Sequence, residues 1–179
     1  GNFQAVIKGN SEEKELKYGA ILLATGSREL KPEGSYLYGD NPNVLTQGDL
    51  EKALKKGDFS YDSVTMIQCV EARNDKRPYC SRTCCIDALK NAIILKKKNP
   101  KANVYILYRD MMAFGFYENY YRESQEKYGI KYFRYTLDKP PEVKAAGNKL
   151  NITVHDTHLG EEIALDADKL VLSTPQIPA

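Results

Sequence analysis

Residues 63–98 read SVTMIQCVEARNDKRPYCSRTCCIDALKNAIILKKK, and this stretch decides the fold. Its first six residues, 63–68, include the apolar Val64, Met66 and Ile67 and predict a strand. From Cys84 to Lys98 apolar residues recur at helical spacing, which is typical of an amphipathic helix, and Pro100 stops it. A strand, a loop and a helix form the first part of a β-α-β unit, so a parallel sheet is expected.

After this helix the sequence continues to alternate between strands and helices. Residues 103–108 and 130–136 are predicted strands, and residues 116–128 are a predicted helix that Gly129 terminates. Later segments indicate a short antiparallel meander and a last apolar strand, at residues 143–145, 150–155, 161–165 and 170–173. The predicted fold class is therefore α/β: a nucleotide-binding-like (Rossmann-like) parallel sheet with crossover helices, plus a short antiparallel β-meander.

The part of the chain before residue 63 has a less regular pattern. Residues 1–7 predict a short strand, and the apolar run in residues 19–24 predicts a buried strand closed by a tight turn at Thr25 and Gly26. A further helix is predicted over residues 47–56. Its boundaries are indicated by the capping pair Thr46 and Asp49 and by the terminating Gly57.

Composition sets broad limits on the function. The 179 residues amount to one domain of ordinary size or parts of two, and 42% are hydrophobic, enough for a real core. A net charge of +2, with acidic residues interspersed among the basic ones, gives little support to a nucleic-acid surface. No apolar run approaches the roughly 20 residues that a membrane helix needs. We expect a soluble, intracellular (cytoplasmic) protein without a membrane span.

The chain's four cysteines are the residues that say most about chemistry. All of them lie in one short stretch, at Cys69, Cys80, Cys84 and Cys85. Four thiolates can complete the coordination of a metal centre, either an iron–sulfur cluster or zinc. Zinc sites usually use two C-x2-4-C pairs, which this spacing fits poorly. The remaining alternative is one or two disulfides, although a bond between neighbouring cysteines is strained and needs an oxidising compartment.

The cysteines occupy the place where a nucleotide-binding fold would carry its phosphate loop. That loop reads G-x-G-x-x-G, whereas residues 69–83 contain no glycine. NAD(P) is therefore not expected to bind here. The helix N-terminus that would face a phosphate would instead stabilise an anionic four-thiolate cluster. The loop also contains four cations: Arg73, Lys76, Arg77 and Arg82. These side chains are expected either to be solvated or to tune the reduction potential of the cluster.

Residues 69–85, CVEARNDKRPYCSRTCC, followed by ALKNA at residues 88–92, resemble the A subunit of heterodisulfide reductase. The resemblance extends to related flavoprotein subunits of anaerobic electron-transfer complexes. Further matching segments are YILYRD at residues 105–110, GFYE at 115–118 and KPPEV at 139–143. The family implies a thioredoxin-reductase-like core, with FAD in a first dinucleotide-binding domain and the cysteine loop replacing the nicotinamide site of a second.

The resemblance also implies roles for particular residues. The cysteine pattern maps a 4Fe-4S cluster onto Cys69, Cys80, Cys84 and Cys85. The turn formed by Ala24, Thr25 and Gly26 matches a turn that lies against FAD in related flavoproteins, and Lys90 resembles a family lysine placed towards the flavin. Related proteins have a second turn of this kind near the end of the matching region. At that place this sequence departs from the pattern and has Ser173, Thr174 and Pro175.

The N-terminal G-x-G-x-x-G that would bind FAD is absent from the chain. The resemblance therefore implies a fragment, with residues 1–60 as the tail of an FAD domain and residues 61–179 as the cluster-bearing domain. Alone, such a fragment should bind FAD weakly or not at all. Its expected function is electron transfer between the cluster and the FAD of a longer protein, with other redox subunits as partners. The alternative is a structural docking module that zinc or a disulfide stabilises.

Overall fold

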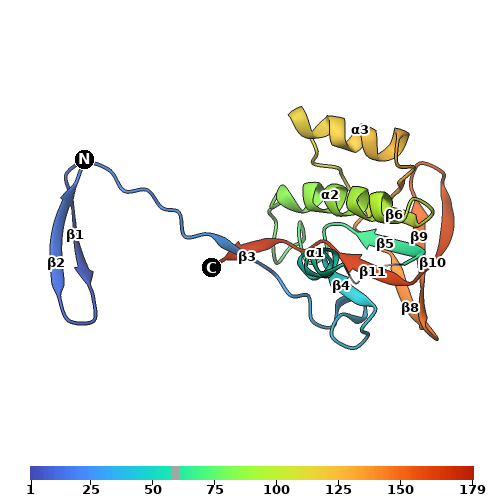
Figure 1. The fold of residues 1–179 in the computed structure, drawn as a ribbon, viewed down its shortest axis with the longest axis horizontal. Helices are drawn as coiled ribbons and strands as arrows, with labels where there is room; N and C mark the ends of the chain where they lie inside the picture. The colour runs from blue at the N-terminus through green and yellow to red at the C-terminus, as the bar shows by residue number, and fades with distance from the viewer. Residues whose placement is uncertain (58–60) are drawn as a thin grey trace. The chain divides into compact units, whose positions relative to one another are not determined.

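The computed structural model describes residues 1–57 and 61–179 (Figure 1). These residues divide into two compact units, residues 1–28 with 178–179 and residues 29–177. The domain boundary expected at residue 60 lies outside the described residues, so the division into a flavin tail and a cluster domain stays a prediction. No helix in the described part of the chain is both long and apolar enough to cross a membrane.

The smaller unit is built on a hairpin. β1 (Phe3–Lys8) pairs with β2 (Glu13–Tyr18) in antiparallel register, which confirms the first predicted strand and adds an unpredicted partner. The buried strand predicted over residues 19–24 is wrong, because these residues are irregular and Leu22 and Leu23 are 93% and 85% exposed. An apolar run becomes a buried strand only where neighbouring strands satisfy its backbone, and the described hairpin does not extend to this run.

The larger unit contains a parallel sheet of five strands, in the order β4-β11-β5-β6-β7. The bounds of its strands are β4 (Val44–Thr46), β5 (Ser63–Ile67), β6 (Asn103–Tyr108), β7 (Lys131–Arg134) and β11 (Lys169–Leu172). The predicted α/β class with a parallel sheet is therefore confirmed. The last strand of the five along the chain, β11, inserts between the edge strand β4 and β5.

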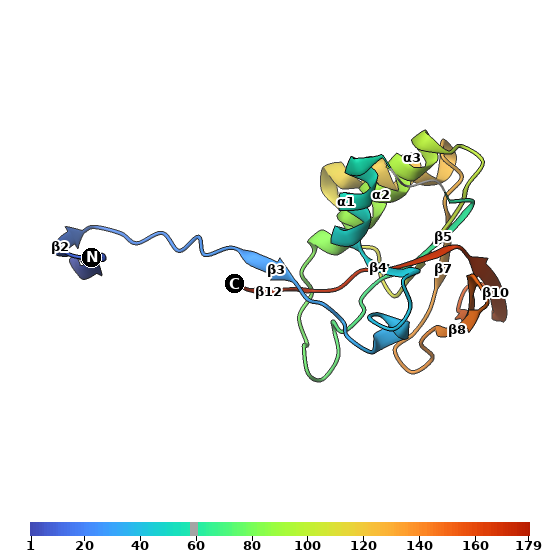
Figure 2. The ribbon, with the colours of Figure 1, turned by 60° about the horizontal axis from the view of Figure 1, so that its bottom comes forward.

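Three helices cover one face of this sheet and an antiparallel meander covers the other (Figure 2). The helices are α1 (Gln47–Lys56), α2 (Thr83–Lys98) and α3 (Glu118–Glu126). The meander strands are β8 (Glu142–Ala146), β9 (Lys149–Asp156) and β10 (Glu161–Ala167). Successive side chains of a strand point to opposite faces. Met66 therefore joins the helix-side core and Ile67 the meander-side core.

Local sequence signals predicted several boundaries correctly. Thr46 and Asp49 form the expected capping box at the start of α1, and Gly57 ends the helix in a left-handed conformation. The helix predicted over residues 116–128 is shorter than expected, because a 3-10 turn, η2 (Gly115–Tyr117), precedes α3. Short elements that carry no clear sequence pattern were not predicted: β3 (Ser27–Glu29), η1 (Ser35–Leu37), β4 and β12 (Gln176–Pro178). Of these, β3 and β12 pair with each other.

Asp156 at the end of β9 should make stability depend on pH in the acid range. The buried carboxylate accepts hydrogen bonds from the backbone N–H groups of Arg134, His158 and Leu159, at 2.6, 2.9 and 2.8 Å. Burial alone would raise the pKa of Asp156, but these bonds lower it below its ordinary value. The stabilisation is therefore present above the unfolded pKa of about 4 and is lost as pH falls below it.

We expect Asp156→Asn to destabilise the protein by about 1–3 kcal/mol at pH 7, and by less as the pH approaches 3. Denaturant unfolding at a series of pH values measures this difference. Asp40→Asn, at an exposed position, is the matched control and should follow the wild-type protein throughout. An equal loss for Asp156→Asn at pH 7 and pH 3 would contradict this role for the carboxylate.

Candidate cysteine metal centre

The cysteines lie where strands of the parallel sheet end and α2 begins. Cys69 follows β5 by two residues, and Cys84 and Cys85 occupy the first turn of α2. Cys69, Cys84 and Cys85 are 9%, 6% and 1% exposed, whereas Cys80 in the connecting loop is half-buried. All four are free thiols. The fold thus gathers a donor set that is mostly shielded from water, at the edge where open α/β sheets bind their ligands.

The thiols influence one another's pKa values. A side-chain hydrogen bond with Cys85, burial, and the charges of Cys85, Cys69 and Cys80 all raise the pKa of Cys84. The partner thiol is affected in the opposite direction. Its hydrogen bond with Cys84 and a backbone hydrogen bond from Met112 lower the pKa of Cys85, against the opposing effect of burial. Cys85 therefore loses its proton more readily than Cys84, and metals bind thiolates rather than thiols.

The backbone around the cysteines adopts a conformation that non-glycine residues rarely take. Cys69, Glu71 and Arg73 have φ values of 60°, 57° and 55°, and Arg82, directly before α2, has φ of 62°. Such left-handed residues turn backbone N–H groups towards a common concavity that can bind an anion. Among the described residues, no side chain caps the N-terminus of α2. The first-turn amides and the positive end of the helix dipole therefore favour negative charge at Cys84 and Cys85.

Individual hydrogen bonds to sulfur add to this effect. The backbone N–H of Arg82 donates to Cys80 Sγ at 3.4 Å, and Arg73 Nη1 donates to Cys69 Sγ at 4.0 Å. Cys85 Sγ lies 3.9 Å from the carbonyl oxygen of Asp110, to which its thiol donates. Hydrogen bonds that sulfur accepts stabilise a coordinating thiolate and tune the reduction potential of an iron–sulfur cluster.

The next strand supplies residues that sequence reasoning did not assign to the site. Asp110, two residues after β6, pairs with Arg73 at 2.6 Å and with Arg134 at 3.2 Å. Arg109 is buried and donates to the backbone of the cysteine loop. The signal that could have found them is topological: β5 and β6 are parallel neighbours, so the residues after each strand meet at one edge of the sheet.

The arrangement does not form a ready site for a single metal ion. Among the described residues, no group of three or more histidine, cysteine, aspartate or glutamate side chains converges closely enough to hold one. Four thiolates around one zinc ion share a single atom at about 2.3 Å. The thiolates of a four-iron cluster bind four different irons, so they lie farther apart. A cluster therefore does not require the four sulfur atoms to converge on one point.

The other predicted site residues lie away from the thiols or in the smaller unit. Lys90 on α2 forms ion pairs with Glu51 at 2.9 Å and with Asp87 at 3.5 Å. Burial would lower its pKa, but the hydrogen bond and charge of Glu51 together with Asp87 raise it, so Lys90 stays a cation. Ala24, Thr25 and Gly26 are exposed, and Gly26 has the left-handed φ of 76° expected at a tight turn.

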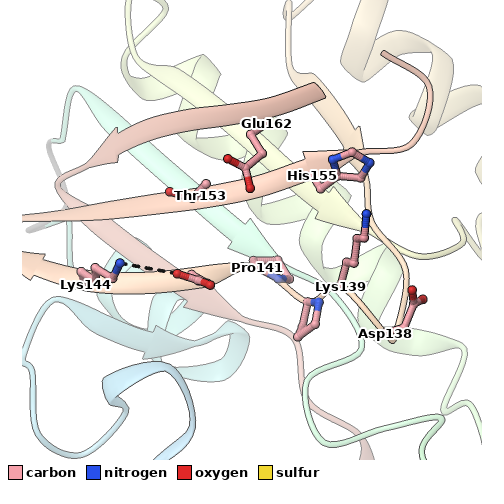
Figure 3. Close-up of a pocket in the computed structure, with 9 residues that line it drawn as sticks. Asp138, Lys139, Pro141, Lys144, Thr153, His155 and Glu162 are labelled. Atoms are coloured by element: carbon pink, nitrogen blue, oxygen red, sulfur yellow. Dashed lines mark ion pairs between the residues drawn. The ribbon is translucent and has the colours of Figure 1, made fainter. Parts of the chain in front are cut away.

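A cavity of about 620 Å³ lies on the meander and is separate from the cysteine site (Figure 3). Its lining includes three carboxylates and two lysines together with one histidine: Asp138, Glu142, Glu162, Lys139, Lys144 and His155. Lys144 and Glu142 form an ion pair at 3.5 Å across one side of it. No cysteine lines this cavity, so it contributes nothing to the candidate metal centre.

Two relatives match this chain over nearly its whole length. The iron-sulfur A subunit of the CoB--CoM heterodisulfide reductase of Methanocaldococcus jannaschii is 39% identical over 189 residues, which cover 93% of this chain and 28% of the relative. The A subunit of the H(2)/formate:CoB-CoM heterodisulfide,ferredoxin reductase of Methanococcus maripaludis is 37% identical over 182 residues, covering 90% and 27%. The chain thus spans about a quarter of the length of these relatives.

Solved structures show the same fold at much lower sequence identity. Thioredoxin reductase of T. acidophilum superposes with a TM-score of 0.51 over 97% of this chain and 51% of that enzyme, at 16% identity. No protein-family model matches the chain. The superposition shows that the chain shares its α/β fold with this enzyme.

Proposed function

Because this chain belongs, over nine tenths of its length, to the family of heterodisulfide reductase A subunits, we propose that it is a cluster-binding electron-transfer module. The proposed ligands are Cys69, Cys80, Cys84 and Cys85, and the proposed group is a 4Fe-4S cluster. Such a cluster supplies transfer of single electrons. The observation that carries the proposal is that four free thiols, three of them buried, lie between the end of β5 and the first turn of α2.

The chain's own residues would perform three tasks in this module. Its thiolates would hold the irons. The backbone N–H groups of Arg82 and Met112, which donate to the sulfur atoms of Cys80 and Cys85, would lower the cost of the negative charge. The burial of Cys84 and Cys85 would keep water from the sulfur atoms. The glycine-free loop between β5 and α2 lacks a phosphate cradle, so the module would exchange electrons without binding NAD(P) itself.

The flavin side of the proposal concerns the longer relatives. We propose that in a protein of full length the turn of Ala24, Thr25 and Gly26 contacts FAD and that Lys90 lies towards the flavin. The cation of Lys90 and the left-handed turn at Gly26 support these roles. Electrons would pass between that FAD, the cluster and the other redox subunits of a complex. The chain alone would bind FAD weakly or not at all.

The competing function is a docking module stabilised by zinc or a disulfide. Elemental analysis of protein purified without oxygen separates the two. We expect iron in excess of zinc, with acid-labile sulfide in equal amount to iron. One zinc per chain with no labile sulfide would reject the electron-transfer function, and so would a disulfide in protein kept under reducing conditions.

A further inference from the structure

The chain that leads from β11 into β12 contacts both ends of the cysteine loop, residues 68–82. At the first end, the carbonyl oxygen of Ser173 accepts a hydrogen bond at 3.0 Å from the backbone N–H of Val70, the residue after the first cysteine. At the second end, the backbone N–H of Gln176 donates at 2.8 Å to Oγ of Ser81, the residue after the second cysteine. One short segment therefore joins the two arms of the loop that carry these cysteines.

This segment is itself held firmly in the larger unit. Ser173 and Thr174 are 0% and 3% exposed. Ser173 Oγ accepts a hydrogen bond from Gln47 Nε2 at 3.0 Å, and Thr174 Oγ1 donates to the carbonyl oxygen of Leu30 at 2.7 Å. The backbone N–H of Leu30 donates in turn to the carbonyl oxygen of Pro175 at 3.0 Å. Buried polar groups that are paired in this way form a rigid support.

Cys80 is the thiol of the set that most needs such a support. It is more exposed than the three buried cysteines, and it lies in the irregular part of the loop, outside the helices and strands. The hydrogen bond from Gln176 to Ser81 ties this part of the loop to a segment outside it. The position of Cys80 relative to the buried thiols therefore depends on the hydroxyl group of Ser81.

We propose that Ser81 is a positioning residue that holds Cys80 within reach of the metal centre formed with the three buried thiols. The inference rests on the proposed function, in which all four thiolates hold iron. The backbone N–H of Arg82 donates to Cys80 Sγ at 3.4 Å, and Arg82 has a left-handed φ of 62°. A displacement of the neighbouring Ser81 would disturb this donor together with the thiol. Ser81→Ala removes the acceptor of the Gln176 hydrogen bond and keeps all four cysteines.

The first test uses the metal-free, reduced chain and follows alkylation of each cysteine by iodoacetamide with mass spectrometry. We expect Ser81→Ala to react at Cys80 roughly threefold faster or more, a factor typical of one lost neutral hydrogen bond, while Cys84 and Cys85 keep their wild-type rates. Ser81→Thr retains the hydroxyl group and should restore the wild-type rate at Cys80. Tyr79→Phe is the matched control, because it removes a hydroxyl group from the other neighbour of Cys80, which is 42% exposed. It should react like the wild type.

The second test reconstitutes the same variants with iron and sulfide without oxygen. Transfer of iron to a chelator and the EPR spectrum after reduction are then measured. We expect Ser81→Ala to lose iron roughly threefold faster or more and to show a changed spectrum, because one of the four ligands is held less firmly. Ser81→Thr should restore both properties, and Tyr79→Phe should match the wild type.

The outcomes distinguish this inference from the proposed function. If the wild-type chain takes up no iron, the proposed function fails, and the alkylation rates still decide whether Ser81 holds Cys80. If the wild type binds iron and Ser81→Ala equals it in alkylation, iron loss and EPR spectrum, only the positioning role fails. Faster alkylation of all four cysteines would also overturn this role, because the substitution would then have loosened the whole site. Faster alkylation of Cys80 with unchanged iron loss would overturn it too, as would failure of Ser81→Thr to restore the wild-type behaviour.

Discussion

A serine at position 84 should leave the chain unable to hold four irons. Cys84 is 6% exposed, lies in the first turn of α2, and is influenced by the three other thiols of the set. Serine is a much poorer ligand for iron than a thiolate. Because the position is buried, a water molecule cannot replace the lost thiolate as a ligand. We expect Cys84→Ser to lose the cluster or to retain it with fewer irons, with a changed EPR spectrum.

Iron and acid-labile sulfide assays after identical reconstitution measure this effect. Thr83→Ser is the matched control, because it changes an exposed residue next to Cys84 in the same turn and keeps all four thiols. It should bind as much iron as the wild type. Full iron content in Cys84→Ser would show that Cys84 is not a ligand. Circular dichroism of both metal-free variants checks that the fold is intact.

Ile106→Ala should cost about 2–5 kcal/mol of unfolding free energy, a large part of the roughly 5–15 kcal/mol that stabilises a typical domain. Ile106 lies in β6, between β5 and β7, where its partners in register are Met66 and Tyr132. It is fully buried in the core between the sheet and the helices. Truncation to alanine removes apolar contacts between the sheet and the helices. The sheet and α2 cannot move together to fill the space that the side chain leaves.

Denaturant unfolding of metal-free, reduced protein measures the cost. Leu159→Ala is the control, because Leu159 is 60% exposed in the turn between β9 and β10 and should change the free energy by less than about 0.5 kcal/mol. Similar losses in the two variants would mean that Ile106 does not lie in the core between the sheet and the helices. Because β6 leads directly into Arg109 and Asp110, this result bears on the site as well as on the fold.

The sequence predicted the larger unit well where local patterns and tertiary packing agree. The buried strands ending at Gln68 and Tyr108, the helix stopped by Pro100, and the capping pair Thr46 and Asp49 all appear close to the expected positions. The strand expected over residues 19–24 failed for the opposite reason. Its apolar side chains require neighbouring strands, and the described residues supply none for them.

The candidate site was predicted only in part. Sequence spacing identified the four cysteines, because thiols crowded into one loop indicate a metal centre. Arg109 and Asp110 were not assigned to it, because they are separated from Cys69 by 40 and 41 positions and meet it only through the pairing of β5 with β6. The left-handed backbone at Cys69 was also unpredictable, since no glycine marks it.

The central claim is that these four cysteines hold a redox-active 4Fe-4S cluster. The most direct measurement is EPR of the chain after reconstitution without oxygen and reduction, combined with iron and sulfide assays on the same sample. About four irons and four sulfides per chain, with a signal that appears on reduction and disappears on reoxidation, is the predicted result. A chain that takes up no iron, or that binds zinc tightly and shows no reducible signal, would contradict the claim.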